Sequence, residues 1–335
     1  MRLAREDLFR LIEPLLPLVE KPSRYLDHEW GAVEEQPGPF HACLVYPDAY
    51  EVGQPNLGIS ILYDALNGAD GISCERCYLP WHDMADLMRE RHVPLLALES
   101  AAPLASFDLV GFTLAHELVA TNIVETLDLA GIPVRAADRA EDDAIVIAGG
   151  PSVWNAEPLA PMFDAILLGD GEDAIVEIAA CVRDARSVGA SRENILLALS
   201  RIQGVYVPSL YDVVVDSTST RWGYAVPKPG SGAPEVVLKR CVADFASTPA
   251  CAEHIVPYMG IVQDRLAIEV LRGCARGCRF CQAGMTYRPV RERPMDQVVE
   301  ASERGLAETG YDELSLTSLS TTDHSQCAPM LNELD

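Results

Sequence analysis

The sequence predicts an α/β protein whose main part is a doubly wound parallel sheet of the Rossmann or flavodoxin type. The first observation is that short, continuous apolar runs alternate with amphipathic segments between residues 40 and 210. Strands buried on both faces have such runs, which favours a parallel sheet covered by helices. The second is that glycine-bearing loops follow several of the runs, where doubly wound sheets bind ligands. The third is a group of cysteines after a later apolar run.

The main part is expected at residues 40–210. Its predicted strands cover residues 42–46, 109–112, 144–148 and 165–168, and its predicted helices about 58–66, 81–90, 117–130, 174–185 and 192–200. An N-terminal extension is predicted at 1–39, and a β-rich connector at 211–262 with runs at 211–215, 221–226 and 235–241. Residues 263–335 read as two β/α units, with parallel strands at 266–271 and 313–317 and helices from about 295 to 309 and from about 325.

The cysteine group has the spacing C-x3-C-x2-C, formed by Cys274, Cys278 and Cys281. Thiolates this close in one loop can hold a 4Fe-4S cluster, which takes a ligand on each of its four irons. Three cysteines leave one iron open, as catalytic zinc sites leave a position open for substrate. The alternatives are structural zinc, with Cys327 as a distant fourth ligand, or a chance grouping.

Composition narrows the class of protein. A net charge of −24 disfavours nonspecific binding to nucleic acid. The sequence has no stretch of eighteen apolar residues that could span a membrane. Ten unevenly spaced cysteines and a start that does not read as a secretory signal predict a reducing, cytoplasmic location. Arginines cluster between residues 272 and 293. They either pair with nearby acids or set a positive field around an anionic centre.

The cysteine loop, with the aromatic Phe280 before its third cysteine, resembles the radical S-adenosylmethionine (SAM) superfamily. The resemblance implies a partial (β/α) barrel in which the open iron binds SAM, and in which reduction cleaves SAM to start radical chemistry. It assigns Phe280 to the flank of SAM. Ser318 and Ser320 stand where related proteins often hold the SAM amino group with Gly-Gly-Glu. An electron donor such as flavodoxin or ferredoxin is also implied.

The preceding domain resembles the cobalamin-binding domain of one radical SAM class. The residues that carry this resemblance are Asp48, Tyr50 and Gly53, then Gly149, Gly150 and Pro151, then Gly169, Gly171 and Glu172. Tyr50 stands in place of the histidine that binds cobalt. Since a phenol is a poor cobalt ligand unless deprotonated, cobalamin is expected without a histidine ligand, or the fold without the cofactor. Glycine also simply makes tight turns, so these loops have a structural alternative.

Further stretches at 21–25, 47–58 and 281–291 resemble one family of cobalamin-domain radical SAM proteins across essentially the whole chain. Radical SAM barrels commonly have six β/α units, whereas two are predicted here. The expectation is a fragment, a split subunit completed by a second polypeptide, or a remnant. The predicted function is reductive cleavage of SAM, with cobalamin-assisted methyl transfer as one option. The alternative is a non-catalytic module that binds a cofactor or partner.

Overall fold

The computed structural model describes residues 9–26, 29–33, 38–215, 223–250 and 255–335. Its main part is a six-stranded sheet in the order β2-β1-β3-β4-β5-β6. The strands are β1 (Phe40–Tyr46), β2 (Ile72–Tyr78), β3 (Leu109–Thr113), β4 (Ile145–Gly149), β5 (Ala165–Leu167) and β6 (Val205–Tyr206). The first five run parallel and β6 runs antiparallel to β5. The order 2-1-3-4-5 is that of flavodoxin-like sheets, in which ligands bind beyond the carboxyl ends of the strands.

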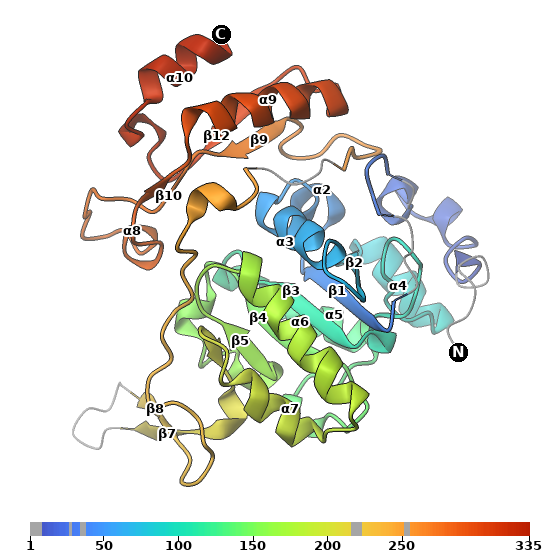
Figure 1. Cartoon of the computed structure of the whole chain (residues 1–335). Helices are drawn as coiled ribbons and strands as arrows, with labels where there is room; N and C mark the ends of the chain where they lie inside the picture. The colour runs from blue at the N-terminus through green and yellow to red at the C-terminus, as the bar shows by residue number, and fades with distance from the viewer. Residues whose placement is uncertain (1–8, 27–28, 34–37, 216–222, 251–254) are drawn as a thin grey trace.

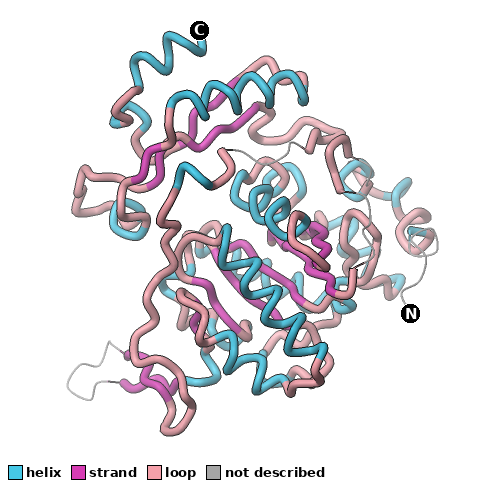
Figure 2. The backbone as a smooth tube through the Cα atoms, in the orientation of Figure 1, coloured by secondary structure: helices cyan, strands magenta, loops and turns pink. Residues whose placement is uncertain are grey.

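Helices cover both faces of this sheet (Figures 1 and 2). They are α2 (Tyr50–Gly53), α3 (Leu57–Asn67), α4 (His82–Arg91), α5 (Ala120–Ala130), α6 (Glu172–Ser187) and α7 (Arg192–Leu199). One hydrophobic core contains Met84 of α4 and Ile123 of α5, and a second, on the opposite face, contains Ile59 of α3 and Ile178 of α6. The two cores explain why the strands read as continuous apolar runs.

Strand β2 was not expected, because three of its seven residues, Ser73, Glu75 and Arg76, are polar or charged. All seven are buried, and the charge of Arg76 is paired inside the protein. The Arg76 guanidinium lies 2.6 Å from a carboxylate oxygen of Glu29 and 2.6 Å from one of Glu99. Burial of a charge is tolerated when it is paired and hydrogen-bonded, so hydropathy alone misses such a strand.

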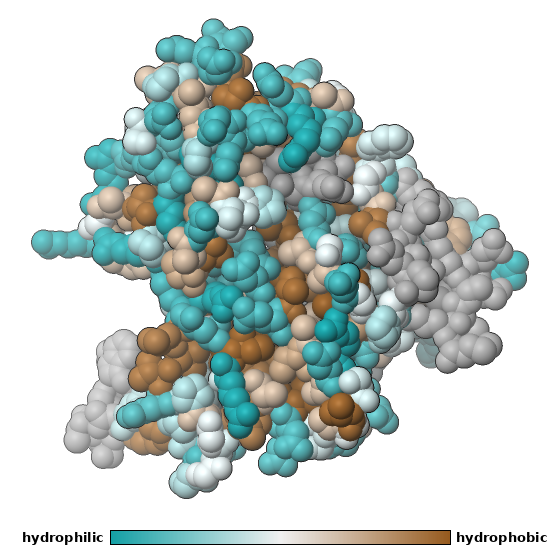
Figure 3. Space-filling view, viewed as in Figure 1, coloured by the Kyte–Doolittle hydropathy of each residue, from teal (hydrophilic) through white to brown (hydrophobic). Residues whose placement is uncertain are grey.

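The connector forms one hairpin, β7 (Tyr211–Val215) paired antiparallel with β8 (Gly223–Pro227). On the face shown in Figure 3, apolar side chains gather near this hairpin, where Val213 and Val215 are exposed. The strand expected at 235–241 does not form. That segment instead runs beside the end of β5 and makes one isolated parallel bridge, Gly169 with Arg240.

A second, smaller unit follows. Strands β9 (Leu266–Glu269) and β12 (Leu314–Thr317) pair in parallel, as predicted, with α9 (Met295–Thr309) and α10 (Cys327–Leu334) packed beside them. Between them, β10 (Leu271–Arg272) and β11 (Arg291–Glu292) form a short antiparallel pair, and α8 (Ala283–Thr286) lies in the loop that they enclose. In the part of the chain described, no helix has the length and apolar character needed to span a bilayer.

Candidate functional site

A cavity of about 370 Å³ lies where the carboxyl ends of both parallel sheets meet. The α/β sheet contributes Thr113 at the end of β3, Gly149 at the end of β4 and the loop after β5. The second unit contributes Glu269 at the end of β9 and Thr317 at the end of β12. Cavities of this size are typical of small-molecule sites.

Two predicted ligand loops line this cavity. The first holds Gly149, Gly150 and Pro151, and the second runs from Gly169 to Glu172. A Cβ on Gly149 would meet no atom within 4 Å, so its backbone borders open space. Gly150, at φ +106°, is a structural glycine, because a Cβ there would lie 2.8 Å from the Leu114 carbonyl oxygen. The sequence allowed either a ligand role or a turn role for this pair. Gly149 has the open surroundings that a ligand contact requires, whereas Gly150 is required by the turn.

The third predicted loop, with Asp48, Tyr50 and Gly53, does not line this cavity. Tyr50 is buried and its hydroxyl donates a hydrogen bond to Glu29, the carboxylate that also pairs with Arg76. Burial and the nearby Glu29 charge raise the pKa of Tyr50, so its hydroxyl stays protonated. A contact between these residues and cobalamin stays a prediction.

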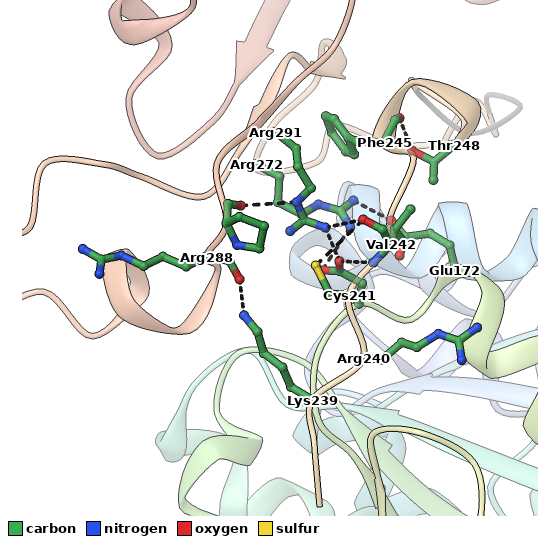
Figure 4. Close-up of polar contacts among 12 residues, drawn as sticks. Glu172, Lys239, Arg240, Cys241, Val242, Phe245, Thr248, Arg272, Arg288 and Arg291 are labelled. Carbon is green, nitrogen blue, oxygen red and sulfur yellow. Dashed lines mark hydrogen bonds and ion pairs between the residues drawn. The ribbon is translucent and has the colours of Figure 1, made fainter.

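The acidic residues of the loop after β5 bind arginines of the second unit. Arg272 lies 3.2 Å from Asp170, 2.5 Å from Glu172 and 2.7 Å from Glu269, and Arg291 also pairs with Asp170. Figure 4 shows Arg272 and Arg291 side by side, directed toward Glu172 at the start of α6 and Val242 of the connector. Glu172, predicted to contact cobalamin, therefore serves here to join the two units.

The ring of Phe245, in the connector, packs against the guanidinium groups of Arg272, Arg291 and Arg293. Its ring centre is 4.9 Å from the guanidinium carbon of Arg272 and 4.5 Å from that of Arg293. Burial opposes ionisation of Asp170, but hydrogen bonding from Arg291 and the charge of Arg272 outweigh it and lower the pKa of that carboxyl. Asp170, Phe245 and their arginine partners were not singled out as one site from the sequence. The arginine run was the one available signal, and pairing with acids is the interpretation that the structure confirms for Arg272, Arg276 and Arg291.

The cysteine loop lies between β10 and β11. It starts at Gly273, at φ +89°, where a Cβ would lie 2.6 Å from the Pro289 carbonyl oxygen. Cys274 and Cys281 are half-buried, Cys278 is exposed, and none of the three is in a disulfide. The Cys281 sulfur accepts a hydrogen bond from the Gly284 amide at 3.3 Å, and the Cys274 sulfur accepts one from the Arg276 amide at 3.5 Å. Hydrogen bonds to sulfur stabilise thiolates and tune cluster potentials.

Residues predicted near SAM lie beside this loop. Ser320, after β12, donates a hydrogen bond to Asp323 at 2.8 Å, and Asp323 forms a bidentate ion pair with Arg276 of the cysteine loop. The Ser318 and Thr321 hydroxyls hydrogen-bond to each other at 2.7 Å. Phe280 is 93% exposed, so its ring is available to a ligand on the outer side of the loop.

The cysteine loop fits an iron–sulfur cluster by its donor set: three thiols, in one accessible loop, near backbone amides. No three His, Cys, Asp or Glu side chains converge on one point among the described residues, as a single metal ion would require. A 4Fe-4S cluster binds each thiolate at a different iron, so its cysteine sulfurs surround the cluster instead of meeting at one atom.

The other cysteine pair, Cys74 and Cys77, is not a site of this kind. Both lie in β2 and are buried. Cys74 packs in the core on one face of the sheet and Cys77 in the core on the other. The two thiols therefore lie on opposite faces of the sheet.

Two family models match the chain in succession. The model for the N-terminal region of radical SAM proteins matches residues 58–208, and that for the radical SAM superfamily matches residues 268–334. The chain belongs to the radical SAM superfamily, whose members use a 4Fe-4S cluster and SAM. The superfamily match begins in β9 and contains the whole cysteine loop.

Individual proteins are more distant. The chain is 24% identical over 298 residues to the uncharacterized protein MJ0966 of Methanocaldococcus jannaschii, covering 88% of this chain and 52% of that protein. Among solved structures it matches the radical SAM methyltransferase TsrM of Kitasatospora setae in two forms. One has tryptophan and a SAM analogue bound, and the other has cobalamin and a [4Fe-4S] cluster bound. Both give a TM-score of 0.49, with 17% and 18% identity, and cover 88% of this chain and 50% of TsrM. The chain thus spans about half the length of these relatives.

Proposed function

We propose that this chain binds a 4Fe-4S cluster through Cys274, Cys278 and Cys281 and SAM at the open iron, and that it initiates radical chemistry on a substrate near the cavity. The observation that carries the proposal is that the carboxyl ends of both parallel sheets border one cavity, and that the strand pair enclosing the cysteine loop starts at its wall. In barrel and doubly wound folds alike, reacting groups bind at this edge.

The residues of the chain have separable roles in this proposal. The three thiolates hold the cluster, and the amides of Arg276 and Gly284 hydrogen-bond to two of the sulfurs. The hydroxyls of Ser318 and Ser320 offer hydrogen bonds to the polar groups of SAM beside Arg276. When reduced, the cluster supplies the electron that cleaves SAM.

The cysteine assignment is tested by iron and sulfide content after anaerobic reconstitution. The Cys278→Ala variant should lose the cluster while the α/β unit keeps its circular dichroism spectrum, because Cys278 is exposed and contributes little to packing. The matched control is Cys181→Ala, a half-exposed cysteine of α6 that should keep full iron and sulfide. Full content in Cys278→Ala would refute the assignment.

We propose cobalamin as a second ligand, with part of it in the cavity beside Gly149, Gly150 and Pro151. The open space at Gly149 supports this, because a ligand can approach the backbone there without meeting a side chain. Tyr50 is buried and hydrogen-bonded to Glu29, so we do not expect it to bind cobalamin.

Absorbance titration with hydroxocobalamin tests this second ligand. Gly149→Val adds a side chain to the cavity wall and should weaken binding at least about tenfold, a loss of about 1.4 kcal/mol. Gly260→Val is the control, because a Cβ there also meets no atom within 4 Å and Gly260 does not line the cavity. Equal affinity of the two variants would place the ligand elsewhere.

A further inference from the structure

One carboxylate of the α/β unit contacts both ends of the cysteine loop. Arg272 is the last residue before the loop and Arg291 the first residue of the returning strand, and the two are directly paired in the β10–β11 ladder. Both arginines form ion pairs with Asp170, one with each of its carboxylate oxygens. Residues 273–290, which contain all three cysteines, thus lie between two arginines that bind the same carboxylate, that of Asp170.

The contact is buried and well satisfied. The side chains of Asp170, Arg272 and Arg291 are 9%, 12% and 10% exposed. Asp170 also accepts a hydrogen bond from the Val242 amide at 2.8 Å, so the connector fixes its orientation. Removing one partner from a buried ion pair leaves a charge without compensation, which is costly.

The local backbone places this carboxylate with little freedom. Gly169 lies against the connector, so close that a Cβ would be 2.0 Å from the Arg240 carbonyl oxygen. The Asp170 amide donates to that same oxygen at 3.1 Å. The same four residues, from Gly169 to Glu172, line the cavity. The loop that a ligand would touch is therefore also the loop that holds the cysteine loop.

We propose that Asp170 is a positioning residue that fixes both ends of the cysteine loop against the α/β unit and links the cavity to the order of that loop. The link to a cluster rests on the function proposed above; the positioning of the loop does not. The two arginines are held unequally. Arg272 keeps Glu172 and Glu269 when Asp170 is lost, whereas Asp170 is the one carboxylate paired with Arg291 in the described structure. Loss of Asp170 should therefore loosen mainly the returning end of the loop.

The test is hydrogen–deuterium exchange of residues 273–290 in the iron-free full chain. In Asp170→Asn, exchange of this segment should rise on the order of tenfold, because local opening no longer breaks a buried charge pair. Arg291→Gln should raise it similarly, and the double variant should add little to either single one, since all three lose the same interaction. Asp170→Glu should restore part of the protection.

The control is Asp173→Asn, an acid in the first turn of α6 that is 60% exposed and does not line the cavity. It should leave exchange of 273–290 unchanged. The proposal would be overturned if residues 273–290 exchanged as slowly in Asp170→Asn as in the wild type, or if the effects of the two single variants added in the double variant. Because no iron is present, this result is independent of whether the cluster assembles.

A second readout addresses the link to the cavity. Hydroxocobalamin added to the iron-free chain should slow exchange of 273–290 in the wild type and have a smaller effect in Asp170→Asn. Binding that slows exchange equally in both would overturn the link. Absence of binding would count against both the cobalamin proposal and this link, while the exchange results without ligand would still decide the positioning role.

Discussion

At the scale of single residues, the site depends on glycines at positions where the backbone has a positive φ and leaves no room for a Cβ. Gly169 has φ +112° and lies against the Arg240 backbone. The sequence predicted a glycine loop at this place, and its two interpretations, ligand contact and tight turn, could not be separated. What decides between them is the close approach of the connector at Arg240, more than seventy residues later in the chain. No local sequence pattern indicates this contact.

Gly169→Ala should therefore destabilise the protein by more than about 2 kcal/mol, through backbone strain and a clash with a carbonyl that cannot move away cheaply. Gly131→Ala is the matched control: it has φ +69° but open space around the Cβ position, so about 1 kcal/mol is expected. Urea unfolding of the two variants makes the comparison. Equal losses of stability in the two variants would mean that the contact with the Arg240 backbone does not constrain residue 169.

At the scale of elements, β2 shows a limit of hydropathy. Its Arg76 is buried between Glu29 and Glu99, which ties the strand to the N-terminal segment and to the loop before β3. The four other parallel strands of the main sheet were found from the sequence because they are apolar. The pairing that makes β2 a strand involves residues more than twenty positions away, so it is not visible in the strand itself.

Arg76→Met should cost about 3–5 kcal/mol, because two buried carboxylates lose their common cation. The Arg89→Met variant is the control, since Arg89 makes its ion pairs at the surface and is 44% exposed. Its loss should stay below about 1 kcal/mol. Similar losses in both variants, measured by urea unfolding, would contradict this account of β2.

The N-terminal segment is attached to α2 by a second ionic contact. Glu51 accepts hydrogen bonds from Arg24 at 2.7 Å and from Lys21 at 3.0 Å. Burial alone would raise the pKa of Glu51, but these cations outweigh it and lower the pKa from 4.5 to about 2. A carboxyl whose pKa is lower in the folded than in the unfolded state stabilises the fold above the unfolded pKa.

The contribution of Glu51 should therefore be complete above about pH 4.5 and disappear as the pH falls toward 2. The measurement is the difference in unfolding free energy between wild type and Glu51→Gln across this range. The difference should shrink with falling pH. A difference that stays constant from pH 6 to 3 would show that the carboxylate charge has no part in it.

At the scale of the whole molecule, sequence reasoning predicted the α/β class, the parallel pairing of β9 with β12 and the superfamily. The order and spacing of local patterns carry that information. How the two units meet was not predicted, because Asp170 and Arg272 are more than a hundred positions apart in the sequence and each alone reads as an ordinary surface charge. The assignment of residues to domains, and of individual residues to SAM and cobalamin, stays a prediction.

The central claim is that the cysteine loop holds a cluster with an open iron. The measurement that tests it most directly is electron paramagnetic resonance of the anaerobically reconstituted, reduced chain, recorded with and without SAM. The account predicts the signal of a reduced 4Fe-4S cluster whose shape changes when SAM is added, because SAM binds the iron without a cysteine. A cluster signal that is the same with and without SAM would contradict an open iron, and no cluster signal at all would contradict the assignment of the three cysteines.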